Sequence, residues 1–333
     1  MVADVKPKSS FVNPAFLRTQ LNRFGPLFGL ILVIVIFSIL TGDPERYLAP
    51  KNLRTVLVQT VIVAIGAIGM TMIIISGGID LSVGSVIALT GVIGALCLKS
   101  GLPPLLAIAI AILVGGLVGV INGLAITRLR VVPFIATLGM LGIARGVAKG
   151  IAGSQTVIIP ETWANDLLLT VPRHDWMLFA PGVWIAIALA IIAAVVLRNT
   201  VFGRRVFALG SNEAAARACG INTDRLKVTI YALAGLLFGL AGVFQLSRLR
   251  VGDPTVAAGL ELDVIAAVVI GGGSLSGGEG TILGSMIGAL IMAFLRSGCQ
   301  QLGWENYVQE IIIGIIIVTA VALDRWRSSR VVV

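Results

Sequence analysis

Charged residues, histidine and cysteine are all scarce in this chain of 333 residues. Only 12% of the residues are charged, whereas a soluble domain carries roughly 25%. The one histidine, His174, lies in a predicted loop, and the sequence contains neither a His-Glu-x-x-His nor a Gly-x-Ser-x-Gly motif. A Gly-Lys dipeptide is also missing, which excludes the phosphate-binding loop of an ATPase. These absences argue against an enzyme and place any energy source outside the chain.

The cysteines indicate no cross-linked or metal-bound fold. Cys97, Cys219 and Cys299 are far apart in the sequence, and two of them fall on or beside long apolar runs. This spacing is typical of neither a disulfide framework nor a metal site. The first apolar run, residues 25–41, lacks a small-residue cleavage site, which favours a retained anchor over a signal peptide.

Long apolar runs take up most of the chain, of which 57% is hydrophobic. A run of about 17–25 apolar residues can cross a bilayer core of roughly 30 Å. The pattern predicts an all-α polytopic membrane protein with about ten transmembrane helices, of which the eighth is too short to cross. The predicted spans are residues 25–41, 55–76, 81–98, 103–126, 131–150, 180–197, 228–246, 262–272, 281–297 and 307–323.

Charge is distributed unevenly between the two sides of these spans. If the N-terminus is inside, the inner segments receive fifteen basic and six acidic residues, which accounts for the whole net charge of +9. This is the positive-inside pattern of membrane proteins, so no nucleic-acid partner is expected. We expect a cytoplasmic segment at 1–24, one transmembrane domain at 25–326 and a cytoplasmic tail at 327–333. Within the domain, 151–180 is predicted to be external and 199–227 cytoplasmic.

A glycine-rich segment occurs twice, 194 positions apart and without a gap. Residues 75–96 and 269–290 share ten of 22 residues, among them the pairs Gly77-Gly78 and Gly271-Gly272. Each copy interrupts an apolar run, and interrupted segments at matching places in two halves of a transporter indicate a substrate path. The path is therefore predicted to include Gly77, Gly78, Asp80, Ser82, Ser85, Asn122, Gly271, Gly272, Ser274 and Ser276.

The depth and direction of the two breaks follow from the span lengths. The run before the second break, residues 262–272, measures about 15 Å at 1.5 Å per residue, which predicts that it stops half-way across the membrane. Because the copies match, we expect both breaks at mid-depth. An even number of spans separates them, so the repeats are predicted to be parallel. Small residues also allow helices to pack closely, which is the alternative role for the breaks.

Four polar residues, Asp80, Asn122, Arg145 and Asp263, fall within or at the edge of apolar spans. A charge at mid-membrane costs roughly 2.5–3.5 kcal/mol or more, so it is usually paired within the bundle or lines a water-filled path. Arg145 and Asp263 lie near predicted outer ends and could instead reach headgroups. Asn122 suits a hydrogen bond between helices. Asp80 is the strongest path candidate, although its repeat counterpart is Ser274.

The predicted inner loop, residues 199–227, contains a short helix at 213–219. Asn212 can cap this helix and Gly220 can end it in the left-handed conformation. So short a helix needs a surface to lie on. That surface is either the lipid headgroup region or a cytoplasmic partner, in which case the helix would couple the partner to the membrane domain. The coupling residues are predicted to be Gly203, Arg204, Gly210, Asn212, Glu213, Arg217 and Gly220.

Four segments of the sequence, in order, resemble the transmembrane permeases of bacterial ABC importers for monosaccharides such as ribose, xylose, arabinose and galactose. They are Gly77-Gly-Ile-Asp-Leu-Ser-Val-Gly-Ser85, Pro133-Phe-Ile-Ala-Thr-Leu-Gly-Met-Leu-Gly-Ile-Ala-Arg-Gly146, the loop that includes Thr200-Val-Phe-Gly-Arg-Arg205 and Ala208-Leu-Gly-Ser-Asn-Glu-Ala-Ala-Ala-Arg217, and Gly259-Leu-Glu-Leu-Asp-Val-Ile-Ala-Ala-Val-Val-Ile-Gly-Gly-Gly-Ser274. The resemblance covers nearly the whole chain, from about Phe24 to Trp326.

The resemblance implies a permease homodimer in the bacterial cytoplasmic membrane, with both termini in the cytoplasm. A separate ATPase would bind ATP and magnesium, so no cofactor is expected in this chain, and a sugar-binding protein would deliver the ligand from outside. The segment 208–220 would contact the ATPase. The alternatives are a branched-chain amino-acid or other small-solute permease of the same superfamily, and a secondary transporter. The sparse charges deep in the spans argue against ion coupling.

Overall fold

A computed structural model describes residues 14–171 and 177–329 of the chain. His174, which the sequence places in a loop, lies outside the described residues. Most of the described chain is helical, with one short pair of strands. The elements are α1 (Pro14–Leu40), α2 (Pro44–Tyr47), α3 (Pro50–Ile75), α4 (Val83–Lys99), α5 (Pro104–Thr127), α6 (Pro133–Ile151), β1 (Val157–Ile158), the 3-10 turn η1 (Trp163–Asp166), α7 (Pro181–Asn199), α8 (Val201–Ser211), α9 (Glu213–Ala218), α10 (Thr223–Leu249), β2 (Val251–Gly252), α11 (Leu260–Ile270), α12 (Ile282–Gln301) and α13 (Asn306–Ser329).

Each predicted apolar run overlaps one of these helices. Helices α2, α3, α5, α6 and α7 begin with proline at the first helical position, where its fixed φ and missing N–H cost nothing. In the described part of the chain, six helices are long and apolar enough to cross a membrane, namely α3, α5, α6, α7, α10 and α12. The chain is thus an all-α polytopic membrane protein, and the count of ten spans stays a prediction.

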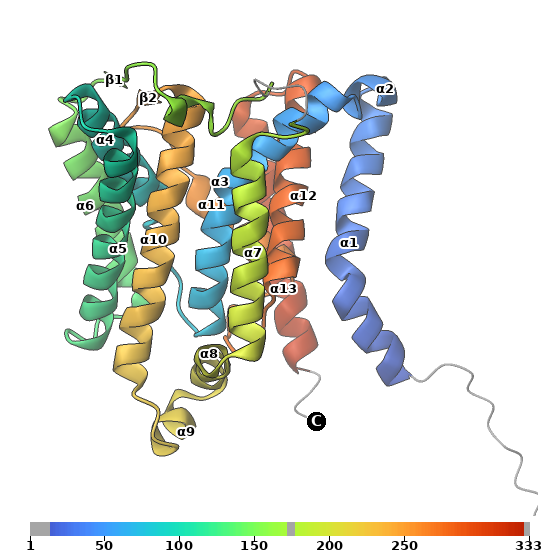
Figure 1. Cartoon of the computed structure of the whole chain (residues 1–333). Helices are drawn as coiled ribbons and strands as arrows, with labels where there is room; N and C mark the ends of the chain where they lie inside the picture. Colours follow the sequence, from blue (N-terminus) through green and yellow to red (C-terminus); the bar gives the residue numbers. More distant parts are fainter. Residues whose placement is uncertain (1–13, 172–176, 330–333) are drawn as a thin grey trace, which may run out of the picture.

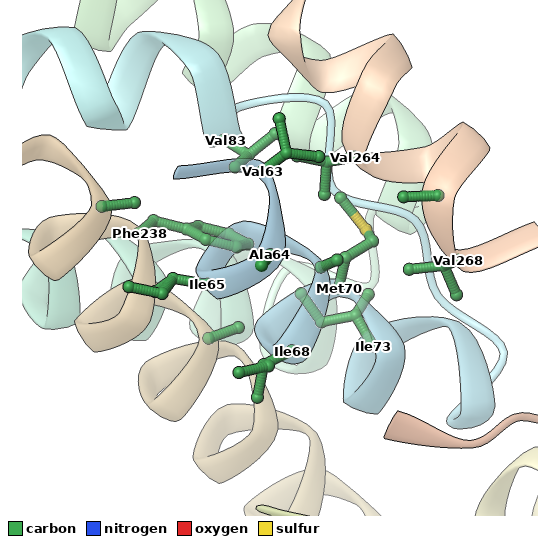
Figure 2. Packing of buried hydrophobic residues seen from close by; sticks show 14 of the residues in the cluster. Val63, Ala64, Ile65, Ile68, Met70, Ile73, Val83, Phe238, Val264 and Val268 are labelled. Atoms are coloured by element: carbon green, nitrogen blue, oxygen red, sulfur yellow. The ribbon is translucent and has the colours of Figure 1, made fainter. Parts of the chain in front are cut away.

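Helix α3 forms the centre of the bundle. In the most apolar 18-residue stretch of α3, 94% of the residues are buried. The corresponding shares for α5, α6 and α7 are 33%, 22% and 28%. Ile65, Ile68 and Met70 of α3 are almost fully buried, and Phe238 of α10 and Val264 of α11 lie among the side chains packed around them (Figure 2). The outer helices expose leucine, isoleucine and valine, as expected of surfaces that face lipid.

The two ends of the bundle differ. The antiparallel pair β1–β2 and the loops around it lie at one end, and α8 and α9 lie at the other (Figure 1). Helix α13 ends and α1 begins at the α8 end (Figure 1). The loop predicted to be external and the loop predicted to be cytoplasmic therefore lie at opposite ends.

Helix α11 is short because it begins inside the bundle. The chain leaves β2 and enters the bundle as turns over residues 253–259. Near the start of α11, Val264 packs against Gly66, which also faces Val83 at the start of α4. Gly66 is nine residues from the end of α3, which is about 14 Å. The expectation that this run stops half-way across is wrong, because α11 starts there and continues toward the α8 end.

Both glycine breaks begin near the α8 end. The hydroxyls of Thr71 in α3 and Ser285 in α12 are 2.7 Å apart, and Gly271 packs against the backbone of Ser285. Gly271 is therefore level with Thr71, about 6 Å from the end of α3. The glycine pairs consequently lie near the α8 end. The prediction that they lie at mid-depth is wrong. As α3 runs from Gly66 to Thr71, α11 runs from Val264 to Gly271, so the two helices point the same way.

Candidate functional site

Asp80 in the first break is held by its own chain and by α5. Its carboxylate accepts hydrogen bonds from the backbone N–H and the hydroxyl of Ser82, at 2.7 and 2.6 Å. Asn122 donates to Asp80 at 3.4 Å and to the Ser82 hydroxyl at 3.1 Å. The Ser85 hydroxyl donates to the Ser82 carbonyl. All four residues are at most 2% exposed, so they form a closed polar network in which Asn122 makes the predicted bond between helices.

The backbone of the first break is attached to two further helices. The Thr137 hydroxyl on α6 donates to the Ile79 carbonyl at 3.2 Å and accepts from the Leu81 N–H at 3.1 Å. Tyr231 on α10 also donates to the Ile79 carbonyl, at 3.4 Å. These bonds satisfy backbone groups that a break in a helix would leave unpaired.

The second break has a different environment. Ser276, the repeat counterpart of Ser82, is exposed, and its N–H donates to the Ser274 hydroxyl at 3.3 Å. Ser274 is 5% exposed, and its N–H donates to the Glu279 carbonyl. Gly272 is exposed and has a φ of +90°. Residues with the same place in the repeat thus differ in burial.

The two breaks meet each other and α8 at one point. The Gly278 N–H donates to the Ile75 carbonyl at 2.8 Å, which joins the second break to the end of α3. Gly210 of α8 packs on this bond so closely that a Cβ there would overlap the Ile75 carbonyl oxygen and lie 2.6 Å from the Gly278 nitrogen. Gly277 lies against Gly210 and Gly77. We call the contact of Gly210, Ile75 and Gly278 the glycine junction.

Helix α8 is the element of the inner loop that the sequence analysis missed. Val206 and Leu209 are buried, whereas Arg204 and Arg205 are exposed. Gly203 packs on the end of α7. This two-sided pattern at helical spacing was a readable signal. Its length of 11 residues, close to the minimum for a helix pattern, hid it among the loop residues.

Helix α9 has the caps that the sequence predicted. The Asn212 side chain accepts from the Ala215 N–H at 2.9 Å, and Gly220 has a φ of +81°. These two expectations are confirmed, and the helix ends one residue early, at Ala218. Arg217 donates to Thr223 and Asp224 at the start of α10, so α9 is attached to the next span.

Glu213 also attaches α9 to α10. It pairs with Lys227 at 2.8 Å and with Arg217 at 3.4 Å. Burial alone would raise the pKa of Glu213, but the two cations outweigh burial and hold its pKa below the ordinary 4.5. The pair therefore stabilises the contact above pH 4.5, and this contribution is lost as the pH falls through the lowered pKa.

We expect Glu213→Arg to loosen α9, because it sets a third positive charge beside Lys227 and Arg217. The Glu213 side chain is 42% exposed, and pairs of this kind contribute about 0.2–1 kcal/mol, so uptake should fall partly while expression survives. Adding Lys227→Glu restores an opposite-charge pair and should recover uptake. Both variants are compared by uptake of the transported solute and by co-purification of the ATPase that the resemblance implies. Parental uptake by the single variant would contradict this role.

A polar cavity of about 270 Å³ lies at the opposite end of the bundle from α8. It is bounded by α3, α10, α11, α12 and the turns at 256–258. Its volume is close to the lower limit of small-molecule sites, about 300 Å³. The polar side chains that line it are Gln59, Gln245, Arg248, Asp263, Arg296 and Gln300. None of the predicted path residues lines this cavity.

The deepest ionic contact of the cavity is between Asp263 and Arg296. The two side chains form an ion pair, and Asp263 is 1% exposed while Arg296 is 38% exposed. Asp263 thus does not reach headgroups, which was one of the two expectations for it. Arg145 likewise bonds within the protein: its guanidinium donates to the carbonyls of Pro254 and Val256 at 2.9 and 2.6 Å. It holds the turns that lead to α11.

Sequence reasoning missed Gln59, Gln245, Arg248, Arg296 and Gln300. Each of these residues lies inside a predicted span or within about four residues of its end. Polar residues are unusual at such positions. That signal was readable one residue at a time. Their convergence was not, because they come from three helices that are far apart in the sequence.

Known proteins match this chain over most of its length. The family described as "Branched-chain amino acid transport system / permease component" matches residues 52–321. The chain belongs to this permease family. It is similar to the "Ribose import permease protein RbsC" of Bacillus subtilis (strain 168), with 41% identity over 93% of this chain and 94% of the relative.

Two further relatives have similar coverage. The "Ribose import permease protein RbsC" of Escherichia coli (strain K12) is 40% identical over 90% of this chain and 93% of its own. The "L-arabinose ABC transporter permease protein AraH" of Azospirillum brasilense is 35% identical over 91% of this chain and 88% of its own. No solved structure matches the chain.

Proposed function

We propose that this permease is the membrane-spanning subunit of an ATP-driven importer that carries a monosaccharide. The observation that carries the proposal is the similarity to ribose permeases, 40–41% identity over at least 90% of this chain. The description of the family names branched-chain amino acids. The sugar assignment is favoured because the relatives named above are named for ribose and arabinose.

The partners follow from what an importer needs and this chain lacks. The sequence has no phosphate-binding loop, so ATP and magnesium would be bound by a separate ATPase. Helices α8 and α9 offer that ATPase an exposed surface, which includes Arg204 and Arg217. A sugar-binding protein would dock at the β1–β2 end, and a second copy of the chain would complete the permease.

The path is proposed to run from the polar cavity, past α11, to the glycine junction. Helix α11 lines the cavity with Leu260 and Asp263, and its other end leads into the second break. The predicted path residues at the α8 end, Gly272 and Ser276, are exposed and suit an inner mouth. This arrangement is supported by α3 and α11, which run in the same direction toward the junction.

The decisive experiment is uptake of radiolabelled sugar into proteoliposomes that contain the permease, its ATPase and its sugar-binding protein. We expect ATP-dependent uptake of D-ribose, L-arabinose or a related monosaccharide. Uptake of L-leucine with a matching binding protein, and of no sugar, would favour the amino-acid alternative. Uptake without ATP would indicate a secondary transporter.

The proposed orientation puts the α8 end in the cytoplasm of a bacterial cytoplasmic membrane. In a Cys97→Ala, Cys299→Ala background, the exposed Cys219 near α9 is the one remaining thiol. A membrane-impermeant thiol reagent should leave Cys219 unlabelled in intact, wall-stripped cells and label it after permeabilisation. Adding Glu161→Cys, at an exposed residue of the predicted external loop, should give labelling in intact cells. The reverse pattern would overturn the orientation.

A further inference from the structure

Four buried polar atoms, all in residues that line the polar cavity, have no hydrogen-bond partner among the described residues. They are Gln59 Oε1, Gln245 Oε1, Asp263 Oδ1 and Arg296 Nε. An unpaired buried polar group is costly, so a cluster of them in one cavity needs an explanation. The other Asp263 oxygen accepts a hydrogen bond from Arg296, which fixes the carboxylate and leaves Oδ1 unpaired.

We infer that the polar cavity is a transient binding site for a neutral polyol, and that Gln59, Gln245 and Asp263 accept hydrogen bonds from its hydroxyl groups. This inference rests on the proposed function and assigns the sugar a position and partners in the permease. The three acceptors come from α3, α10 and α11, and Arg296 adds a donor from α12. A ligand in the cavity thus meets a polar group from each of the four helices.

This distribution selects between the candidate substrates. A branched-chain amino acid carries its polar groups at one end, so its apolar side chain would leave acceptors on another wall unpaired. Only a ligand with hydroxyl groups around its ring can donate to several walls at once. The apolar residues Ile62 and Val63 beside Gln59 suit the less polar face of such a ring.

The burial of the acceptors separates this cavity from a surface cleft. Gln245 is 5% exposed and Asp263 is 1% exposed, whereas Arg248 and Gln300 near the helix ends are exposed. The exposed lining residues of the cavity thus lie toward the β1–β2 end, and the buried ones lie deeper in the bundle. A sugar released at that end would reach Gln245 and Asp263 before any residue of the breaks.

The test is the reconstituted importer with D-ribose as the probe, at a saturating and constant concentration of sugar-binding protein. Gln245→Leu should lower uptake about five- to tenfold, the effect of one lost hydrogen bond. ATP hydrolysis stimulated by the binding protein should persist, so uptake per ATP falls. Gln245→Glu, which keeps an oxygen at the same position, should retain most uptake. The matched control is Gln155→Leu, the same change at an exposed residue outside the cavity.

Two outcomes would overturn the inference without touching the proposed function. One is parental uptake per ATP in Gln245→Leu. The other is a parallel fall in uptake, ATP hydrolysis and melting temperature in both Gln245 variants, which would indicate a packing role. If the unaltered protein imports neither D-ribose nor L-arabinose nor D-fructose, the proposed function itself fails and the inference fails with it.

Discussion

Replacing Gly210 with alanine is expected to uncouple uptake from ATP hydrolysis while the helix bundle stays folded. The added methyl group would overlap the Ile75 carbonyl and crowd the Gly278 nitrogen, both of which are backbone atoms that cannot rotate away. Helix α8 must then move off the glycine junction. Coupling free energies are typically about 1–3 kcal/mol, so uptake per ATP should fall roughly 5- to 150-fold. The measurement is the ratio of sugar taken up to ATP hydrolysed in proteoliposomes.

The matched control is Gly314→Ala in α13, where a Cβ would meet nothing within 4 Å. This variant should transport and couple normally, because alanine suits a helix better than glycine. Equal uptake per ATP in the Gly210 and Gly314 variants would show that α8 does not act through the junction. A Gly210 variant that no longer binds the ATPase would place the role of this glycine in assembly.

The mechanical argument for this result is the position of α11. One end of α11 forms part of the polar cavity, and the other leads into the break that touches α8. The helix has 11 residues and is followed by a segment rich in glycine. A shift of α8 is thus applied next to the break that follows α11, the short helix whose other end lines the cavity. Interfaces of packed helices move between discrete arrangements, which allows a small shift to be transmitted.

Local signals in the sequence predicted local structure well. Asn212 and Gly220 cap α9 as expected, because a cap depends on the few residues beside it. The apolar runs predicted where helices lie for the same reason. The short run at 262–272 was placed at the wrong depth, although Pro254 and Gly259 ahead of it indicated turns that could carry the chain inward.

The polar cavity and the glycine junction could not be predicted in this way. Gln59 and Arg296 are separated by more than 200 residues, and no pattern within either helix indicates that the two face one cavity. Gly210 appeared as one glycine in a loop, and its role follows only from the position of Ile75 and Gly278. The repeated segment predicted two breaks with equal surroundings. Tertiary packing instead buries the first break more than the second.

The last prediction concerns this inequality. Ser82→Leu should strongly destabilise the permease, whereas Ser276→Leu should leave its stability nearly unchanged. Ser82 is 0% exposed, so leucine would overpack the site, which costs about 1–3 kcal/mol. It would also remove a partner of Asp80 and Asn122, and an orphaned buried polar group costs about 1–3 kcal/mol more. Ser276 is exposed, and surface substitutions usually stay within about 0.5 kcal/mol.

The two variants are measured by melting temperature in detergent and by uptake per folded molecule. We expect Ser82→Leu to lower the melting temperature and the yield, with Ser82→Ala, which adds no bulk, showing a smaller loss. Ser276→Leu should keep the melting temperature and reduce uptake, since it puts bulk at the proposed inner mouth beside the glycine junction. If Ser82→Leu melts normally and only uptake is lost, Ser82 lines the path and the closed network around Asp80 opens during transport. If Ser276→Leu transports like the parent protein, the second break does not form the inner mouth, and the path must leave the bundle elsewhere.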